Sequence, residues 1–126
     1  MYATTTFIAT LRYAINEIVP TYYEEAPSKN AVFPFAVITG LNIRDLDQGD
    51  EATFYLELWA DEKAPGATVT LETLCDTLRN RLTNAVIGEA GTFAAHIGFE
   101  RQRTIQDNEF DIAHRRLELS ARIFYN

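Results

Sequence analysis

The chain has 126 residues, of which 47% are hydrophobic and 12% aromatic, enough to build one core, so a disordered chain is excluded. Acidic residues outnumber basic ones by 18 to 11, which gives a formal net charge of −7 at pH 7. Proteins that hold nucleic acid by its phosphates need clustered Lys and Arg, so this charge argues against that class. We expect a single domain over residues 1–126.

The sequence contains one cysteine, Cys75, which has no partner for an intrachain disulfide, so nothing points to an oxidising compartment. The first residues lack the basic start and unbroken apolar run of a signal peptide, and Arg12, Asn16 and Glu17 interrupt any membrane span. We therefore expect folding in a cytoplasm and no membrane partner.

The N-terminal segment carries apolar residues at helical spacing and ends at Pro20. This pattern predicts a helix from about Thr5 to Ile18. Residues 19–33 contain Pro20 and Pro27 together with Ser and Asn, which indicates a loop or an extended arm.

Two strands are expected next, joined by a polar reversal around Gly49 into an antiparallel hairpin. In the first strand, four residues are expected to share one face: Phe35, Val37, Leu41 and Ile43. In the second, residues 53–61, one face is expected to carry Phe54, Leu56 and Leu58, and the other Tyr55, Glu57 and Trp59.

The second half predicts a helix from about Val69 to Asn84 with a leucine-rich apolar stripe that includes Cys75. A strand over residues 94–105 follows, weakened by Gly98, and then a polar loop over residues 106–113. From Arg116 onward every second residue is apolar, which predicts a final strand with two different faces.

The order helix, two strands, helix, two strands predicts an α+β domain with a four-stranded, mainly antiparallel sheet and both helices packed on one face (order α-β-β-α-β-β). The opposite face would carry the aromatic residues Tyr55, Trp59 and Phe124 among charged ones. This mixture fits either a protein partner or ordinary surface.

The sequence shows no catalytic constellation. His114, Ser120 and Asp111 are the residue types of a hydrolase triad, but six residues along one strand separate His114 from Ser120 by about 20 Å. His96, His114 and Cys75 fall on different elements without a metal-ligand spacing. We expect no enzyme activity, no metal and no cofactor.

The elements and their order resemble the tail terminator (tail completion) proteins of long-tailed bacteriophages. After an N-terminal helix, the resemblance lies in "FPFAVITGL", "FYLELWADE", "LETLCDTLRNRL" and the closing "DNEFDIAHRRLELSARIFY". It covers the chain beyond residue 30, and its specificity comes from the order and spacing of these pieces.

The resemblance implies a homohexameric ring that caps the tail tube, stops its elongation and provides the surface that joins the head. The implied partners are other copies of the chain, the tail tube protein and a head-tail connector protein. The implied location is the head-proximal end of the virion tail, after assembly in the host cytoplasm. The acidic net charge adds a hypothesis: DNA passes through the ring without specific binding, repelled by carboxylates.

The interface of such a ring is expected in the arm, in the loops at residues 44–51 and 106–111, and on the polar side of the strands, the final strand above all. Alternating charges on the final strand can set the register between copies. The expected interface residues are Tyr22, Tyr23, Arg44, Asp45, Asp47, Asp50, Glu51, Trp59, Asp107, Glu109, Phe110, Arg115, Arg116, Glu118 and Arg122. A different phage head-tail connector or tail-assembly adaptor is the alternative. A small ligand-binding domain or enzyme is disfavoured because the apolar helix stripes leave little room for a polar pocket.

Overall fold

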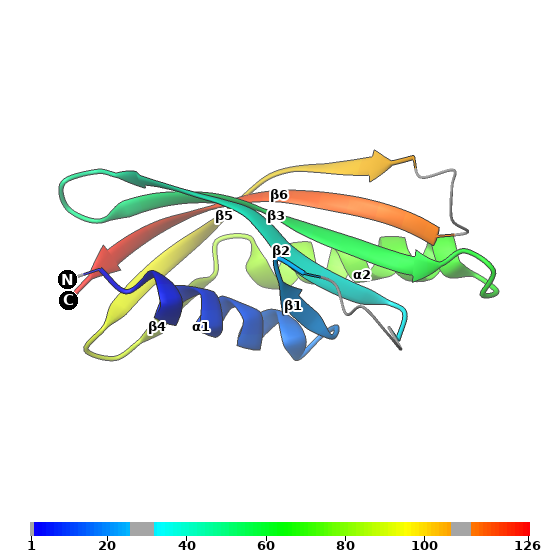
Figure 1. Cartoon of the computed structure of the whole chain (residues 1–126), viewed down its shortest axis with the longest axis horizontal. Helices are drawn as coiled ribbons and strands as arrows, with labels where there is room; N and C mark the ends of the chain where they lie inside the picture. The colour runs from blue at the N-terminus through cyan, green and yellow to red at the C-terminus, as the bar shows by residue number, and fades with distance from the viewer. Residues whose placement is uncertain (1, 26–31, 107–111) are drawn as a thin grey trace.

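The computed structural model describes residues 2–25, 32–106 and 112–126 (Figure 1). Its elements in chain order are α1 (Thr4–Asn16), β1 (Thr21–Tyr23), β2 (Phe35–Asp45), β3 (Asp50–Asp61), α2 (Ala67–Leu82), β4 (Val86–Glu89), β5 (Phe93–Ile105) and β6 (Ile112–Tyr125). Both helices begin and end within two residues of the ends expected from their apolar stripes. Neither helix in these ranges is long and apolar enough to cross a membrane.

The strands form one six-stranded sheet in the order β1-β2-β3-β6-β5-β4. β1 runs parallel to β2, and the other neighbouring pairs are antiparallel, so the sheet is mixed. The expected four-stranded, mainly antiparallel sheet was therefore wrong. Two strands were not predicted: β1, which lies in the segment expected to be a loop or arm, and β4.

The two missed strands are short and are held by contacts that the local sequence does not encode. β1 has only three residues and follows Pro20, and β4 has four and contains Gly88. Asn16 of α1 accepts a hydrogen bond from the Thr21 N–H at 2.9 Å, and Arg12 donates to the Thr21 carbonyl at 2.7 Å. The end of α1 thus places β1 against β2.

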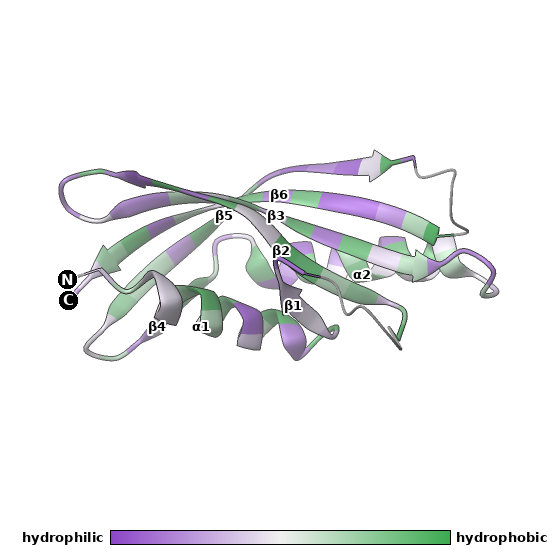
Figure 2. Cartoon of the chain, viewed as in Figure 1, coloured by the Kyte–Doolittle hydropathy of each residue, from purple (hydrophilic) through white to green (hydrophobic). Residues whose placement is uncertain are grey.

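Both helices pack against the same face of the sheet (Figure 1). α1 buries Phe7, Leu11 and Ile15, and it contacts the two edge strands, β1 and β4. α2 contacts β3, β6 and β5 through the stripe Leu71, Cys75, Leu78 and Leu82. Hydrophobic and hydrophilic segments alternate along the long strands (Figure 2), as expected when only one face meets the helices. The other face of the sheet, called here the open face, is not covered by either helix.

A β-bulge divides β2 and changes which residues face the core. The pairing with β3 shifts between Thr39 and Asn42, and Gly40 has a φ of +66°, which glycine adopts without strain. Before the bulge Ala36 and Ile38 join the core, so Phe35 and Val37 lie on the open face. After the bulge, Leu41 and Ile43 lie on the helix side. The expectation that these four residues share one face was wrong, because the extra residue inverts the alternation.

Candidate interaction surface

A strip of stacked rings crosses the open face where β2, β3 and β6 lie side by side. The Trp59 ring stacks on His114 with centroids 4.5 Å apart, and on Phe35 with centroids 5.3 Å apart. Phe35 also contacts Phe33 and Tyr22 at centroid distances of 5.3 and 6.1 Å. These rings come from β1, β2, β3 and β6, so they hold four strands together on the side that the helices leave open.

A buried carboxylate lies next to this strip. Glu57 is only 4% exposed, and both of its oxygens are engaged: His114 Nε2 bonds one and Arg116 Nε donates to the other. Burial by itself raises the pKa of Glu57, but the hydrogen bonds and charges of His114 and Arg116 outweigh it, so the net pKa is lowered. The Arg116 guanidinium also lies 4.6 Å from the centre of the Tyr55 ring. Glu57 is therefore ionised at neutral pH and ties β3 to β6.

Further along the same face, charges of opposite sign lie opposite each other. Glu118 of β6 lies near two arginines of β5, Arg101 at 3.5 Å and Arg103 at 3.9 Å. Its Oε2 is buried and has no hydrogen-bond partner within the described ranges. Glu51 is directly opposite both Arg44 and Arg122. The open face thus alternates in sign, which favours one register over others when it meets another protein.

The turn between β2 and β3 is anchored by two tyrosines from near the ends of the chain, which bond the residues on either side of it. Tyr125 donates to buried Asp50 at 2.8 Å, and Tyr2 donates to Asp45 at 3.2 Å. Burial, followed by the hydrogen bond and charge of Asp50, raises the pKa of Tyr125 to about 12. At the tip, Asp45 accepts the N–H of Asp47, an Asx-type bond that fits the positive φ of Asp47. The tip is an ordered, acidic projection.

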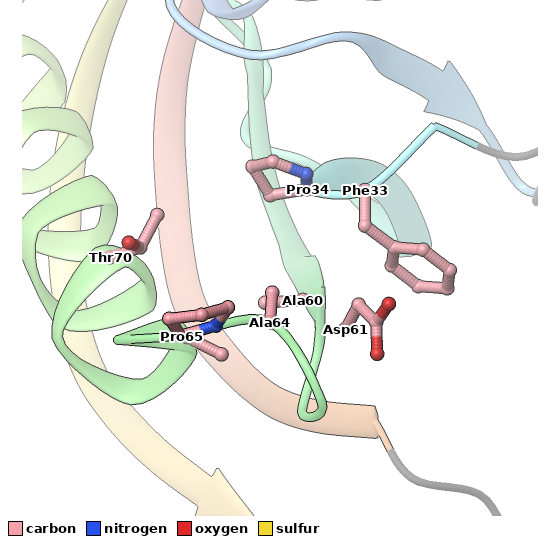
Figure 3. Close-up of a pocket in the computed structure, with 8 residues that line it drawn as sticks. Phe33, Pro34, Ala60, Asp61, Ala64, Pro65 and Thr70 are labelled. Carbon is pink, nitrogen blue, oxygen red and sulfur yellow. The ribbon is translucent and has the colours of Figure 1, made fainter.

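An apolar pocket of about 250 Å³ lies where the start of β2, the end of β3 and the start of α2 meet (Figure 3). Its lining residues are Phe33, Pro34, Ala60, Asp61, Ala64, Pro65, Ala67 and Thr70. Asp61 is the one ionisable residue among them, and its carboxylate accepts the N–H of Lys63 at 3.0 Å. A lone carboxylate does not provide a nucleophile with a base, so the pocket offers no catalytic pair.

Other candidates for chemistry are engaged elsewhere. Cys75 is buried, and burial raises its pKa to about 12, so it is a protonated core residue at neutral pH. Ser120 donates to Glu100 at 2.9 Å. In the described ranges, no three His, Cys, Asp or Glu side chains come together as metal ligands.

The family model "Tail completion protein gp17" matches residues 8–124, which is most of the chain. The chain belongs to this family. The match supports a role in bacteriophage tail completion and a place among the structural proteins of the tail. None of the curated proteins matches this tail completion protein.

A solved structure has the same fold. A chain from the structure titled "Virion of native gene transfer agent (GTA) particle" superposes with a TM-score of 0.63 at 16% sequence identity. The match covers 92% of this tail completion protein and 85% of that chain. At this identity the likeness shows a shared fold.

The structure gathers part of the expected interface of the tail completion protein on the open face and its hairpin. On the open face lie Arg44, Glu51, Trp59, Arg116, Glu118 and Arg122. Asp45 and Asp47 lie in or beside the exposed hairpin tip. Asp107, Glu109 and Phe110 fall outside the described residues.

Four expected residues are engaged within the subunit. Tyr23 packs against the core and Tyr22 against Phe35. Asp50 is buried at the start of β3, next to the turn, and accepts a hydrogen bond from Tyr125. Arg115 points to the helix side, where its guanidinium bonds Glu72 of α2 and the His114 carbonyl.

Three residues of the open face were not predicted to lie on it. Phe35 was assigned to the core face, and Arg101 and Arg103 were not singled out. The alternation of Arg101 and Arg103 with Gln102 and Thr104 could have indicated that the two arginines share one face. A second bulge, between Phe99 and Arg101, changes which face each residue occupies.

Proposed function

We propose that this protein is a tail terminator: a homohexameric ring that caps the tail tube, stops its elongation and presents a surface to which the head is joined. The proposal rests chiefly on the family match over residues 8–124. The protein acts by contact, with other copies of itself, with the tube protein and with a head-tail connector, and it catalyses no reaction. It is assembled in the host cytoplasm and stays at the head-proximal end of the virion tail.

The open face supports this proposal because it is built to be rigid. Stacked rings and the ionised Glu57 network cross-link its strands without help from the helices. A stiff surface loses little conformational entropy on binding, which suits a ring that must close in one geometry. A head-to-tail contact between identical copies closes into a ring when the rotation per copy divides a full turn.

The charge distribution supports passage of DNA without specific binding. The reason is the lack of a positive patch on the open face, in place of the repulsion by carboxylates that the net charge suggested. The five arginines of the open face lie among four carboxylates, those of Glu51, Glu57, Glu100 and Glu118, so the net charge of −7 resides mainly on other surfaces. A near-neutral face gives phosphates no concentrated positive patch. Assembled rings should therefore not retain duplex DNA at low salt, and retention would contradict this part of the proposal.

Electron microscopy of the purified protein mixed with purified tail tubes tests the function. We expect a cap at tube ends and no further growth when tube subunits are added. Bare ends and continued growth would refute the terminator role. A head-tail connector or adaptor, the second candidate, would instead decorate heads while leaving tube growth unchanged.

A further inference from the structure

Two strand segments extend beyond the short strands that flank them. β1 pairs with β2 only at residues 36–38, and β4 pairs with β5 only at residues 93–96. Residues 40–45 of β2 and residues 100–105 of β5 therefore have a strand on one side and, among the described residues, none on the other. We call these segments the β2 edge and the β5 edge.

Each edge begins at a β-bulge and carries charged side chains, both of which weaken strand pairing, but two other obstacles are missing. Neither edge contains Pro or Lys. On the β1 side of β2, the backbone bonds end with the Glu24 N–H donating to the Ile38 carbonyl. On the β4 side of β5 they end at Ile97, whose carbonyl accepts the Asn84 N–H. Most residues of both edges are exposed. Unpaired backbone groups of this kind are a template for an added strand.

The two edges are placed for a head-to-tail contact. They lie toward opposite ends of the molecule, the β2 edge with the hairpin and the β5 edge in the half that contains α2 (Figure 1). Three antiparallel pairings separate β2 from β5, so the two strands run in opposite directions. A neighbour that keeps its helices on the same side would bring its β5 alongside β2 in antiparallel orientation.

The charges of the two edges are complementary. The β2 edge leads into the hairpin tip with exposed Asp45 and Asp47. The β5 edge carries Arg101 and Arg103, whose side chains are 65% and 52% exposed although Glu118 lies near both. With Arg44 and Glu100 counted as well, the β2 edge and its tip keep one excess negative charge and the β5 edge one excess positive charge, so the two attract each other and two tips repel.

We propose that the β5 edge of one subunit takes the β2 edge of the next subunit as an additional antiparallel strand, so that the sheets of neighbouring copies are joined around the ring. This inference rests on the proposed function, because it needs the chain to assemble with copies of itself. The occupant of each edge is a second copy of the same chain, and every contact in the ring is the same.

Disulfide cross-linking tests this pairing directly. Asp45 and Thr104 both lie on the helix side of their strands, because they are opposite Asp50 and Arg115, so their side chains would meet if the edges pair. The variant Asp45→Cys with Thr104→Cys, mixed with tail tubes and then oxidised, should give covalent multimers up to the full ring. Ile43→Cys with Thr104→Cys tests the register two residues away. Buried Cys75 stays out of the reaction.

The matched control is Asp45→Cys with Asn80→Cys, because Asn80 is exposed on α2, away from both edges. Equal cross-linking in the control, or caps on tubes without cross-links in either register, would overturn the edge pairing and leave the terminator function standing. Absence of caps with the unmodified protein would overturn the function, and the pairing with it.

The charges provide a second measurement that does not depend on cysteine. Asp45→Asn with Asp47→Asn keeps the turn bond and tolerates the positive φ. It should weaken association between copies about twofold to threefold, because the two charges attract the β5 edge without forming direct ion pairs with its arginines. Arg81→Glu, which disrupts only the exposed Arg81–Glu17 pair between α2 and α1, should leave association unchanged. Unchanged association in the aspartate variant, with folding confirmed by circular dichroism, would exclude the hairpin tip from the contact.

Discussion

Glu57→Gln removes a buried charge that holds the open face together while keeping the size of the side chain. Gln cannot accept charged hydrogen bonds from His114 and Arg116 through two carboxylate oxygens as Glu57 does. A hydrogen bond to a charged group contributes about 1.5–3 kcal/mol, and breaking a buried ion pair from one side costs about 3–5 kcal/mol. Because 30% of the Arg116 side chain is exposed, water restores part of the loss. We expect the free energy of unfolding to fall by about 2–4 kcal/mol.

Urea unfolding followed by Trp59 fluorescence measures this change, because the indole stacks directly on His114. The urea midpoint should fall while the m-value stays constant. Glu51→Gln is the matched control: it lies on the same strand and face, opposite two arginines, but is only partly buried, and it should cost less than about 1 kcal/mol. If Glu57→Gln is no more costly than Glu51→Gln, the buried carboxylate does not anchor the open face.

Three further outcomes follow from the structure. The difference in the free energy of unfolding between the native protein and Glu57→Gln should be largest near pH 7 and shrink as the pH falls below about 4.3. Folding lowers the pKa of Glu57, so its stabilisation is lost as the pH falls through the folded pKa. A constant difference down to about pH 3 in urea titrations would contradict this. Gly49→Ala should lower the free energy of unfolding by more than about 2 kcal/mol, since φ is +129° and a Cβ would lie 2.1 Å from the Ile123 carbonyl oxygen. Gly66→Ala, at φ +71° with open space around it, should lower it by only about 1 kcal/mol. Thermal unfolding of both variants measures the two changes. Cys75 should react with an aromatic disulfide reagent only after unfolding, because its thiol is buried and its pKa is raised to about 12; rapid labelling of the folded protein would show that α2 opens readily.

The sequence by itself determined the long elements. Apolar residues at 3.6-residue and two-residue spacing specify α1, α2, β3 and β6 locally, because each side chain is placed by the period of its own backbone. The order of these pieces also carried the resemblance to tail completion proteins, which the family match confirmed. The same alternation correctly assigned Trp59, Arg116 and Glu118 to the face opposite the core.

Only the tertiary structure decided the rest. Thr21–Tyr23 becomes a strand because α1 holds its first residue, and a three-residue segment has no period of its own to read. The bulge at Gly40 moves Phe35 to the open face, where it meets Trp59, since one extra residue inverts the alternation on one side of it. Glu57 finds its partners on β6, 57 and 59 residues away along the chain, and such pairs depend on strand register, which is set by the whole sheet.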